Sequence, residues 1–167
     1  MKRFLPVVFA LIIFLNGCCV KDSVTFECVA DSYEEIASPA FYLQAEIPQE
    51  AVLTDSCKDG CCAVFSHDDF EIYQEIFEAE SLDAAVEELT GHSKNSLSMI
   101  CLQTFPQEEY RFAYHAVGEE GTLSCSGKLF YDGDFCYAVT VLCPIENEPL
   151  YHEAFSDLLS LTTLQAV

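Results

Sequence analysis

Three consecutive β-strands joined by two tight turns constrain the fold of this chain more than any other feature. They run from Tyr110 to Cys143, with the sequence YRFAYHAVGEEGTLSCSGKLFYDGDFCYAVTVLC. The turns fall at Gly118–Gly121 and at Asp132-Gly133, because glycine supplies the positive φ that a tight hairpin loop needs. A meander of this kind predicts an antiparallel sheet.

The turns also predict how the strands pair. With Glu119-Glu120 and Asp132-Gly133 at the tips, Tyr114 faces Cys125 and Cys125 faces Thr140. Side chains alternate between the two faces of a sheet, so one face collects most of the apolar residues and is the predicted core side. Its members are Tyr110, Phe112, Tyr114, Leu123, Cys125, Leu129, Cys136, Ala138 and Leu142.

The opposite face of the meander is mixed and is either solvated or covered by another segment. Its members are Arg111, His115, Lys128, Tyr137, Val139 and Val141. Arg111, His115 and Lys128 gather there beside Tyr137 as a basic patch. Either these cations offset nearby carboxylates or line a solvated face, or the patch is a docking surface for an anionic ligand or an acidic partner.

Strands are also predicted before the meander. Residues 41–47 alternate between apolar and polar side chains, which is typical of a half-buried strand, and Pro48 ends it. Shorter apolar runs predict strands at 51–53, 61–66, 70–77 and 97–105.

Two helices complete the pattern. Ser81 caps a predicted helix from Leu82 to about Leu89, and Gly91 lies at its C-cap. A second helix begins at Pro149, and we expect it to lie across the apolar face of the sheet, away from the basic patch. This order predicts an α+β fold, an antiparallel meander packed against a mid-chain and a C-terminal helix.

Composition limits the partners. The chain of 167 residues has 28 acidic and 7 basic residues, a formal net charge of −21 and a pI near 4.1. Nucleic acid is therefore excluded as an expected partner, because phosphate binding needs clustered basic residues. An anionic membrane surface would repel the chain, so any membrane attachment must come from another source.

The N-terminal segment supplies such an attachment. Lys2-Arg3 precedes the apolar run Phe4–Leu15, which is shorter than the roughly 20 residues of a membrane-spanning helix. The Leu15-Asn-Gly-Cys18 segment resembles the lipobox of bacterial lipoproteins. That resemblance implies cleavage before Cys18, acylation of its thiol and a lipid anchor in the cell membrane, with the domain on the extracytoplasmic side. An ordinary signal peptide cut nearby is the alternative.

These features divide the chain into a signal peptide (1–17), a tether (18–39) and a single α+β domain (40–167). The lipobox, early strand, mid-chain helix, meander and closing helix with the sequence FSDLLSL resemble small lipoproteins of the PsbP-like superfamily. The resemblance covers about Ala40 to Leu164. It implies a binding or assembly scaffold without a shared catalytic centre.

Ten cysteines are present, and nine remain if Cys18 is acylated. Cys57, Cys61 and Cys62 are close together in sequence and indicate a disulfide from Cys57 to either of the others, a thiol-redox loop or a zinc site. Cys125 and Cys136 are four residues out of register, roughly 13 Å apart. That separation is too large for a disulfide, so we expect these two cysteines not to pair.

No other motif indicates catalysis. The four histidines are scattered, and no P-loop or GxSxG motif is present. We therefore expect a lipid-anchored, non-catalytic binding or assembly module, without catalytic residues, metal or cofactor, whose partner is a protein or a small ligand. The alternative is a thiol-redox protein that uses Cys57, Cys61 and Cys62.

Overall fold

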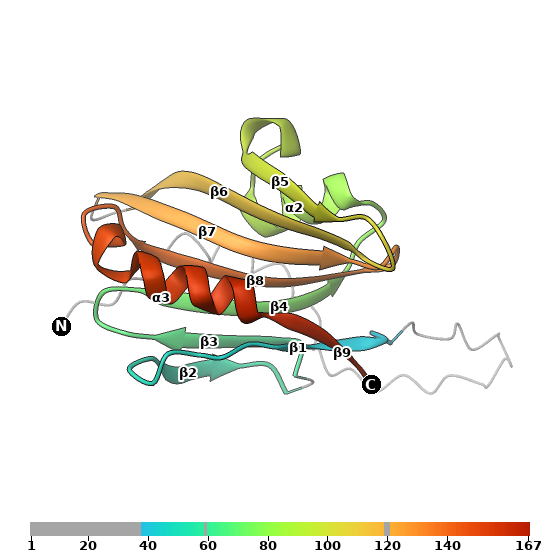
Figure 1. The fold of residues 1–167 in the computed structure, drawn as a ribbon, viewed down its shortest axis with the longest axis horizontal. Helices are drawn as coiled ribbons and strands as arrows, with labels where there is room; N and C mark the ends of the chain where they lie inside the picture. Colours follow the sequence, from blue (N-terminus) through green and yellow to red (C-terminus); the bar gives the residue numbers. More distant parts are fainter. Residues whose placement is uncertain (1–37, 59, 119–120) are drawn as a thin grey trace, which may run out of the picture.

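A seven-stranded antiparallel sheet forms the centre of the molecule (Figure 1). The computed structural model describes residues 38–58, 60–118 and 121–167. The strand order is β2-β3-β4-β8-β7-β6-β5. The strands are β2 (Val52–Ser56), β3 (Cys62–Ser66), β4 (Glu71–Glu78), β5 (Ser98–Gln103), β6 (Glu108–Gly118), β7 (Gly121–Tyr131) and β8 (Phe135–Pro144).

The mid-chain helix α2 (Leu82–Thr90) forms as predicted. Its N-cap residue Ser81 accepts a hydrogen bond from Ala84 N at 3.2 Å through its side-chain oxygen. Gly91 ends the helix with φ 70°, a left-handed conformation that glycine adopts without steric cost. A short 3-10 helix, η1 (Lys94–Ser96), then leads into β5.

The C-terminal helix α3 (Glu148–Leu161) also forms, with Asn147 at its N-cap and a proline in its first turn. The chain then continues as β9 (Thr163–Ala166), which pairs with β1 (Phe41–Gln44) in a separate two-stranded sheet. The sequence predicts no strand after the helix, because four residues are too few to show an alternating pattern. The antiparallel α+β fold class is nonetheless confirmed.

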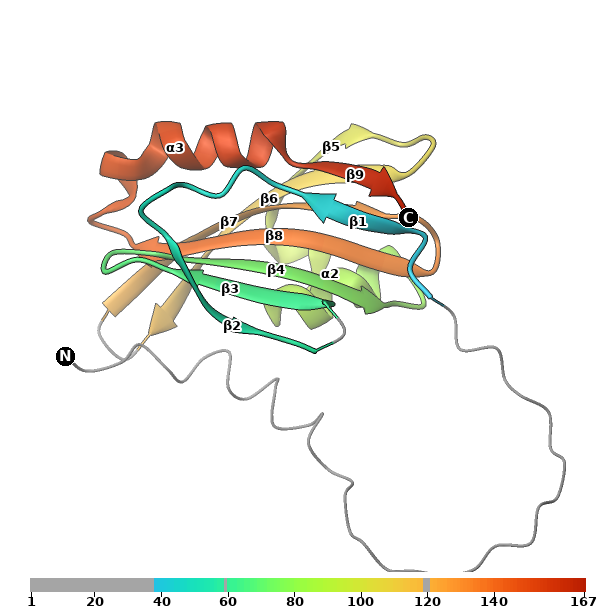
Figure 2. The same ribbon diagram turned by 90° about the horizontal axis from the view of Figure 1, so that it is seen from below.

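The two helices lie on opposite faces of the large sheet (Figure 2). Helix α2 packs on the predicted apolar face, where Leu82, Ala85 and Val86 contact the meander. Helix α3 packs on the mixed face instead, against Val139, Val141 and their neighbours. The expectation that α3 covers the apolar face is therefore wrong. The physical reason is that Val139, Val141 and Cys143 form an apolar stripe on β8 that also requires cover.

The two-stranded sheet extends the cover on the α3 face (Figure 2). Phe41 and Leu43 of β1 and Leu164 of β9 pack on a second group of buried aromatic side chains, Phe130, Phe135 and Tyr137. Both faces of β8 are consequently buried, and all of its residues from Phe135 to Val141 are buried. The mixed face of the meander therefore also packs against a hydrophobic core.

The pairing of β7 with β8 differs from the predicted register by two residues. Tyr131 pairs with Cys136, so Cys125 pairs with Leu142 rather than with Thr140. The turn is longer than Asp132-Gly133, because Asp132 Oδ1 accepts hydrogen bonds from Asp134 N at 3.0 Å and Phe135 N at 2.7 Å. A shift of two keeps every side chain on its predicted face. Cys125 and Cys136 remain unpaired, as expected.

The predicted signal peptide, Cys18 and nearly all of the rest of the predicted tether lie outside the described residues. Within the described ranges, neither helix is long and apolar enough to cross a membrane.

Gly127 on β7 gives a test of the packing under α2. A Cβ at this position would lie 2.3 Å from Phe112 Cζ and 2.8 Å from Val139 O. We expect Gly127→Ala to lower the free energy of unfolding by about 1–3 kcal/mol, because the core must shift to relieve the overlap. Denaturant unfolding measures this change.

The control is Gly118→Ala at the far end of β6, where the nearest atom to the new Cβ is 3.4 Å away. Its effect should stay within about 0.5 kcal/mol. Equal effects at the two positions would contradict the close packing of Phe112 over Gly127.

Candidate functional site: a groove between α3 and the sheet

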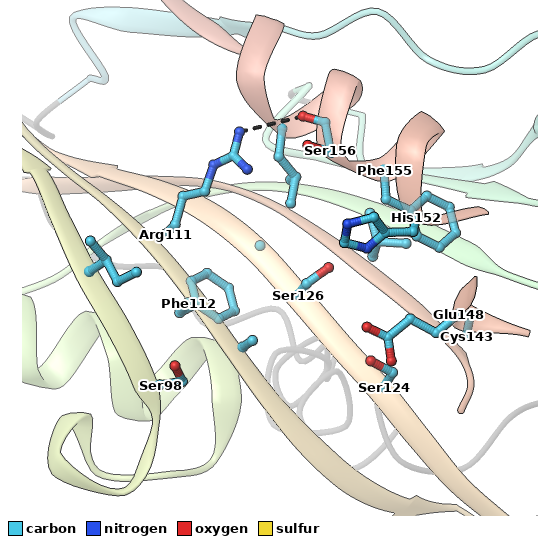
Figure 3. Close-up of a pocket in the computed structure, with 15 residues that line it drawn as sticks. Ser98, Arg111, Phe112, Ser124, Ser126, Cys143, Glu148, His152, Phe155 and Ser156 are labelled. Carbon is cyan, nitrogen blue, oxygen red and sulfur yellow. Dashed lines mark hydrogen bonds between the residues drawn. The ribbon is translucent and has the colours of Figure 1, made fainter. Parts of the chain in front are cut away.

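A groove of ≈ 260 Å³ lies between helix α3 and the β5–β6–β7 part of the sheet (Figure 3). It lies on the α3 face, beyond the line where the helix packs on β8. The side chains and backbone that line it come from four strands and the helix: Ser98, Ile100, Arg111, Phe112, Ala113, Ser124, Ser126, Gly127, Val141, Cys143, Glu148, His152, Phe155, Ser156 and Leu159.

The floor of the groove is open because its side chains are small. Ala113 on β6 pairs with Ser126 on β7, and Ser124 follows two residues away on the same face. Across the sheet, the larger Val139 and Val141 on β8 support α3 directly. The helix therefore packs on the β8 side and leaves space above the small residues of β6 and β7.

The first turn of α3 is held to the sheet by the turn between β3 and β4. Tyr151 Oη donates a hydrogen bond to Asp69 Oδ2 at 2.7 Å, and Asn147 Nδ2 donates to Asp69 Oδ1 at 3.1 Å. Phe70 packs edge-on against Phe155 with ring centroids 5.2 Å apart. These contacts fix the helix wall of the groove, from which Phe155 and Leu159 contribute apolar surface.

Arg111 reaches the groove from β6. Its Nη2 donates to Ser160 Oγ of α3 at 2.7 Å. It also donates to Ser156 O of the same helix at 3.5 Å (Figure 3). Both acceptors are neutral. Among the described residues no carboxylate lies within 4.0 Å of this guanidinium. In a chain with 28 acidic residues, a half-buried arginine without a carboxylate partner marks a position suited to an anion.

The other residues of the predicted basic patch have different environments. Lys128 is buried and donates to Glu109 Oε1 and to Thr162 O, both at 2.8 Å. Tyr137 is fully buried and donates to Asp132 Oδ2 at 2.8 Å. His115 is exposed. The premise of an open basic patch away from the closing helix is wrong, because α3 and the β1–β9 pair cover that face, and Arg111 alone of the four lines the groove.

Cys143 is a buried thiol that also lines the groove. Burial raises its pKa to about 11, and the negative charges of Glu148 and Glu146 add to the shift. A thiol with a raised pKa stays protonated near neutral pH and is a poor nucleophile. The groove is therefore suited to binding rather than to thiol chemistry.

The cysteine-rich loop lies elsewhere, at the β2–β3 turn. Cys57 and Cys62 form a disulfide with their Cα atoms 5.1 Å apart, which is one of the two pairings that the sequence allows. Cys57 N also donates a hydrogen bond to Cys62 O at 3.0 Å, so the disulfide and this hydrogen bond close the same short hairpin. The Cys61 carbonyl accepts a hydrogen bond from Ile76 N at 2.8 Å. A redox role for this loop stays a prediction.

Sequence reasoning missed most of the groove. The serines at 124 and 126 alternate on the same face as Arg111, and His152 and Ser156 are one helical turn apart. These spacings were visible in the sequence. They did not indicate a groove, because the groove forms only when α3 lies on the mixed face, and the spacings do not predict that position.

A carboxyl group is held under α2 on the opposite face. Glu75 of β4 pairs with Ala138 of β8. Burial raises the pKa of Glu75 to about 7, and repulsion by Glu88 of α2 adds to the shift. Ionising this side chain therefore costs the folded state free energy.

Comparisons with known proteins show similarity of fold. No family model and no curated protein matches the chain. Among solved structures, LpqN, involved in cell envelope biogenesis of Mycobacterium tuberculosis, is similar with a TM-score of 0.53 and 9% identity over 78% of this chain and 87% of that chain. Cyanobacterial PsbP from Synechocystis sp. PCC 6803 gives a TM-score of 0.49 and 10% identity over 81% of this chain and 99% of that chain.

At such identities the likeness to LpqN concerns the fold alone. The α+β architecture rests on the helices and the antiparallel sheet described above.

Glu75→Gln tests the half-buried carboxyl under α2. In the unfolded chain the group titrates near the ordinary glutamate pKa of 4.5, and in the folded protein its pKa is about 7. The wild type therefore loses stability relative to the variant as pH rises from about 4.5 to about 7. We expect the variant to equal the wild type at about pH 4 and to exceed it by about 2–3 kcal/mol at about pH 8.

Chemical unfolding at a series of pH values measures the difference. Exposed Glu153→Gln removes the same charge from a solvated position and should show no such trend. A difference for Glu75→Gln that does not change between these pH values would contradict the burial of the carboxyl.

Proposed function

We propose that this chain is a non-catalytic binding module of the cell envelope whose groove takes a small amphiphile with an anionic group. The observation that carries the proposal is Arg111. Its guanidinium faces the groove, and its hydrogen bonds within the described ranges go to neutral oxygens of α3, at Ser160 and Ser156. A carboxylate or phosphate group would supply the charge partner that the described part of the chain does not place there.

The rest of the groove favours an apolar body for this ligand. Val141, Phe155 and Leu159 give it apolar surface, and Ala113 leaves room on the floor. Burial of an alkyl or aromatic group against these side chains supplies affinity without a specific shape. Serines 124 and 126 offer hydroxyl groups for further hydrogen bonds.

Glu148 makes the two ends of the groove differ in charge. It lies at the start of α3, whereas Arg111 contacts the end of that helix (Figure 3). From Glu148 to Ser160 the helix rises about 18 Å. An anionic group is repelled at the Glu148 end and attracted at the Arg111 end, so the ligand would bind with its charged group toward Ser160.

An envelope location is supported by the N-terminal sequence and by one neighbour. The basic residues, the apolar run and the LNGC segment together favour a lipid anchor at Cys18 on the extracytoplasmic side of the membrane. The fold is shared with LpqN, which is involved in cell envelope biogenesis. A domain tethered by acyl chains would meet amphiphiles that leave or enter the membrane.

Arg111→Gln tests the groove. With 11-(dansylamino)undecanoate as the probe, we expect wild type to bind with a rise in dansyl fluorescence and the variant to bind at least about tenfold more weakly, because a charge-assisted hydrogen bond is lost. Lys94→Gln is the matched control, since it removes a cation that lies outside the groove and should leave the affinity unchanged.

A second probe separates the contribution of the anionic group from that of the apolar body of the ligand. The methyl ester of the same dansyl compound lacks the anion, so it should bind wild type and Arg111→Gln equally. Equal affinity of both proteins for the undecanoate itself would overturn the assignment of Arg111, and no binding of any probe would overturn the groove as an amphiphile site.

Cys18→Ser tests the anchor. Full-length wild type grown with radiolabelled palmitate should carry the label and sediment with membranes. The variant should carry none, because the acceptor thiol is absent. Cys19→Ser, one residue later, should keep the label. An unlabelled wild type would contradict the lipid anchor and leave an ordinary signal peptide as the interpretation.

A further inference from the structure

Strand β5 forms one open edge of the large sheet. It is the last strand in the order and pairs with β6 on one side only, so its outer backbone groups have no strand partner among the described residues (Figure 1). Such an edge is a template for pairing with another strand. Soluble proteins usually protect an edge of this kind with charges, prolines or covering segments.

The β5 edge lacks those charges. Its sequence, Ser98-Met-Ile-Cys-Leu-Gln103, has no charged residue and no proline. Ile100 is 63% exposed, Leu102 is 50% exposed and Phe105, just after the strand, is 82% exposed. The opposite edge, β2, carries Asp55 in the strand. A bulge between Cys101 and Gln103 interrupts β5 near its end, so Ser98–Cys101 remains regular.

The charge around β5 is balanced, unlike that of the whole chain. The segment of β6 that pairs with it contributes Glu109 and Arg111, and Glu109 is already paired with Lys128. Lys94 precedes the strand and is paired with Asp83 at 3.6 Å. In a chain of net charge −21, this edge is therefore a place where two copies can approach with little repulsion.

We propose that β5 pairs in antiparallel fashion with β5 of a second copy of this chain. An isologous contact needs only one self-complementary surface, and a strand edge is self-complementary because its backbone donors and acceptors alternate. The pairing joins the two large sheets and covers Leu102 and Ile100. It also places the exposed Cys101 of each copy near that of the other.

The edge and the proposed ligand site overlap in part. Ile100 lines the groove as well as the edge, whereas Cys101 and Leu102 do not line the groove. The test therefore uses Cys101 and Leu102, so that loss of pairing and loss of ligand binding are separate results.

Bis-maleimide cross-linking of the full-length chain in membranes of a bacterial expression host tests the pairing. A short bis-maleimide should join two wild-type chains through their Cys101 thiols and give a band at twice the mass of the chain. Cys101→Ser should lose this band. Leu102→Lys should reduce it about tenfold or more, because the two-fold axis places the new charge in the interface twice.

Val117→Lys is the control. Val117 is 85% exposed at the far end of β6, so its substitution adds the same charge away from the edge and should leave the band unchanged. Circular dichroism of the purified variants checks that both fold.

Three results would overturn the proposal. They are a wild type without a Cys101-dependent band, an equal band in Leu102→Lys and Val117→Lys, and a Cys101-dependent band whose mass is not that of two chains. The last result would mean that a different protein occupies the edge.

Discussion

Burial of β8 on both faces is the constraint on which the rest of the structure depends. From Phe135 to Val141 every residue of the strand is buried. One of its faces is covered by α2, and the other is covered by α3 with the β1–β9 pair. An apolar face left in water would lose the favourable free energy of burying several large side chains. The helices therefore lie on opposite sides of the sheet, and neither side is a solvated face.

The groove follows from that arrangement. Helix α3 is held over β8 by Val139, Val141 and the contacts of Asp69 with Tyr151, so it leaves part of β6 and β7 uncovered. The small side chains of Ala113 and Ser126 leave space beside it. The stripe that fixes the helix and the small residues that open the groove lie on the same face of the sheet.

The environments of Lys128 and Arg111 show that the role of a basic side chain depends on its partners. Lys128 contacts Glu109 and the end of α3 through Thr162 O, so it joins the sheet to the C-terminal segment. A buried cation with a carboxylate partner has a structural role, since removal of that partner would leave an uncompensated charge. Arg111 is one strand away and has neutral partners, which leaves its charge available. The sequence does not distinguish these two roles, because it predicts both residues on the same face of the meander.

The local elements could be predicted because each depends on neighbouring residues. Ser81 and Gly91 define α2 through hydrogen bonds and backbone conformation within a few residues. The alternation along Tyr110–Cys143 determined the two faces, and it survived a two-residue error in register because side chains repeat with a period of two. The error itself arose from the turn, where Asp132 accepts two backbone hydrogen bonds that no spacing rule reveals.

The amino-acid sequence by itself determined the antiparallel meander, both helices, the strongly acidic composition and the segment that resembles a lipobox. The tertiary structure decided which face α3 covers, that Cys62 rather than Cys61 pairs with Cys57, and that Arg111 alone of the predicted basic patch lines a groove. The physical reason is the range of the interactions. Caps, turns and alternation act between near neighbours, whereas the cover of a sheet face depends on apolar stripes far apart in the chain.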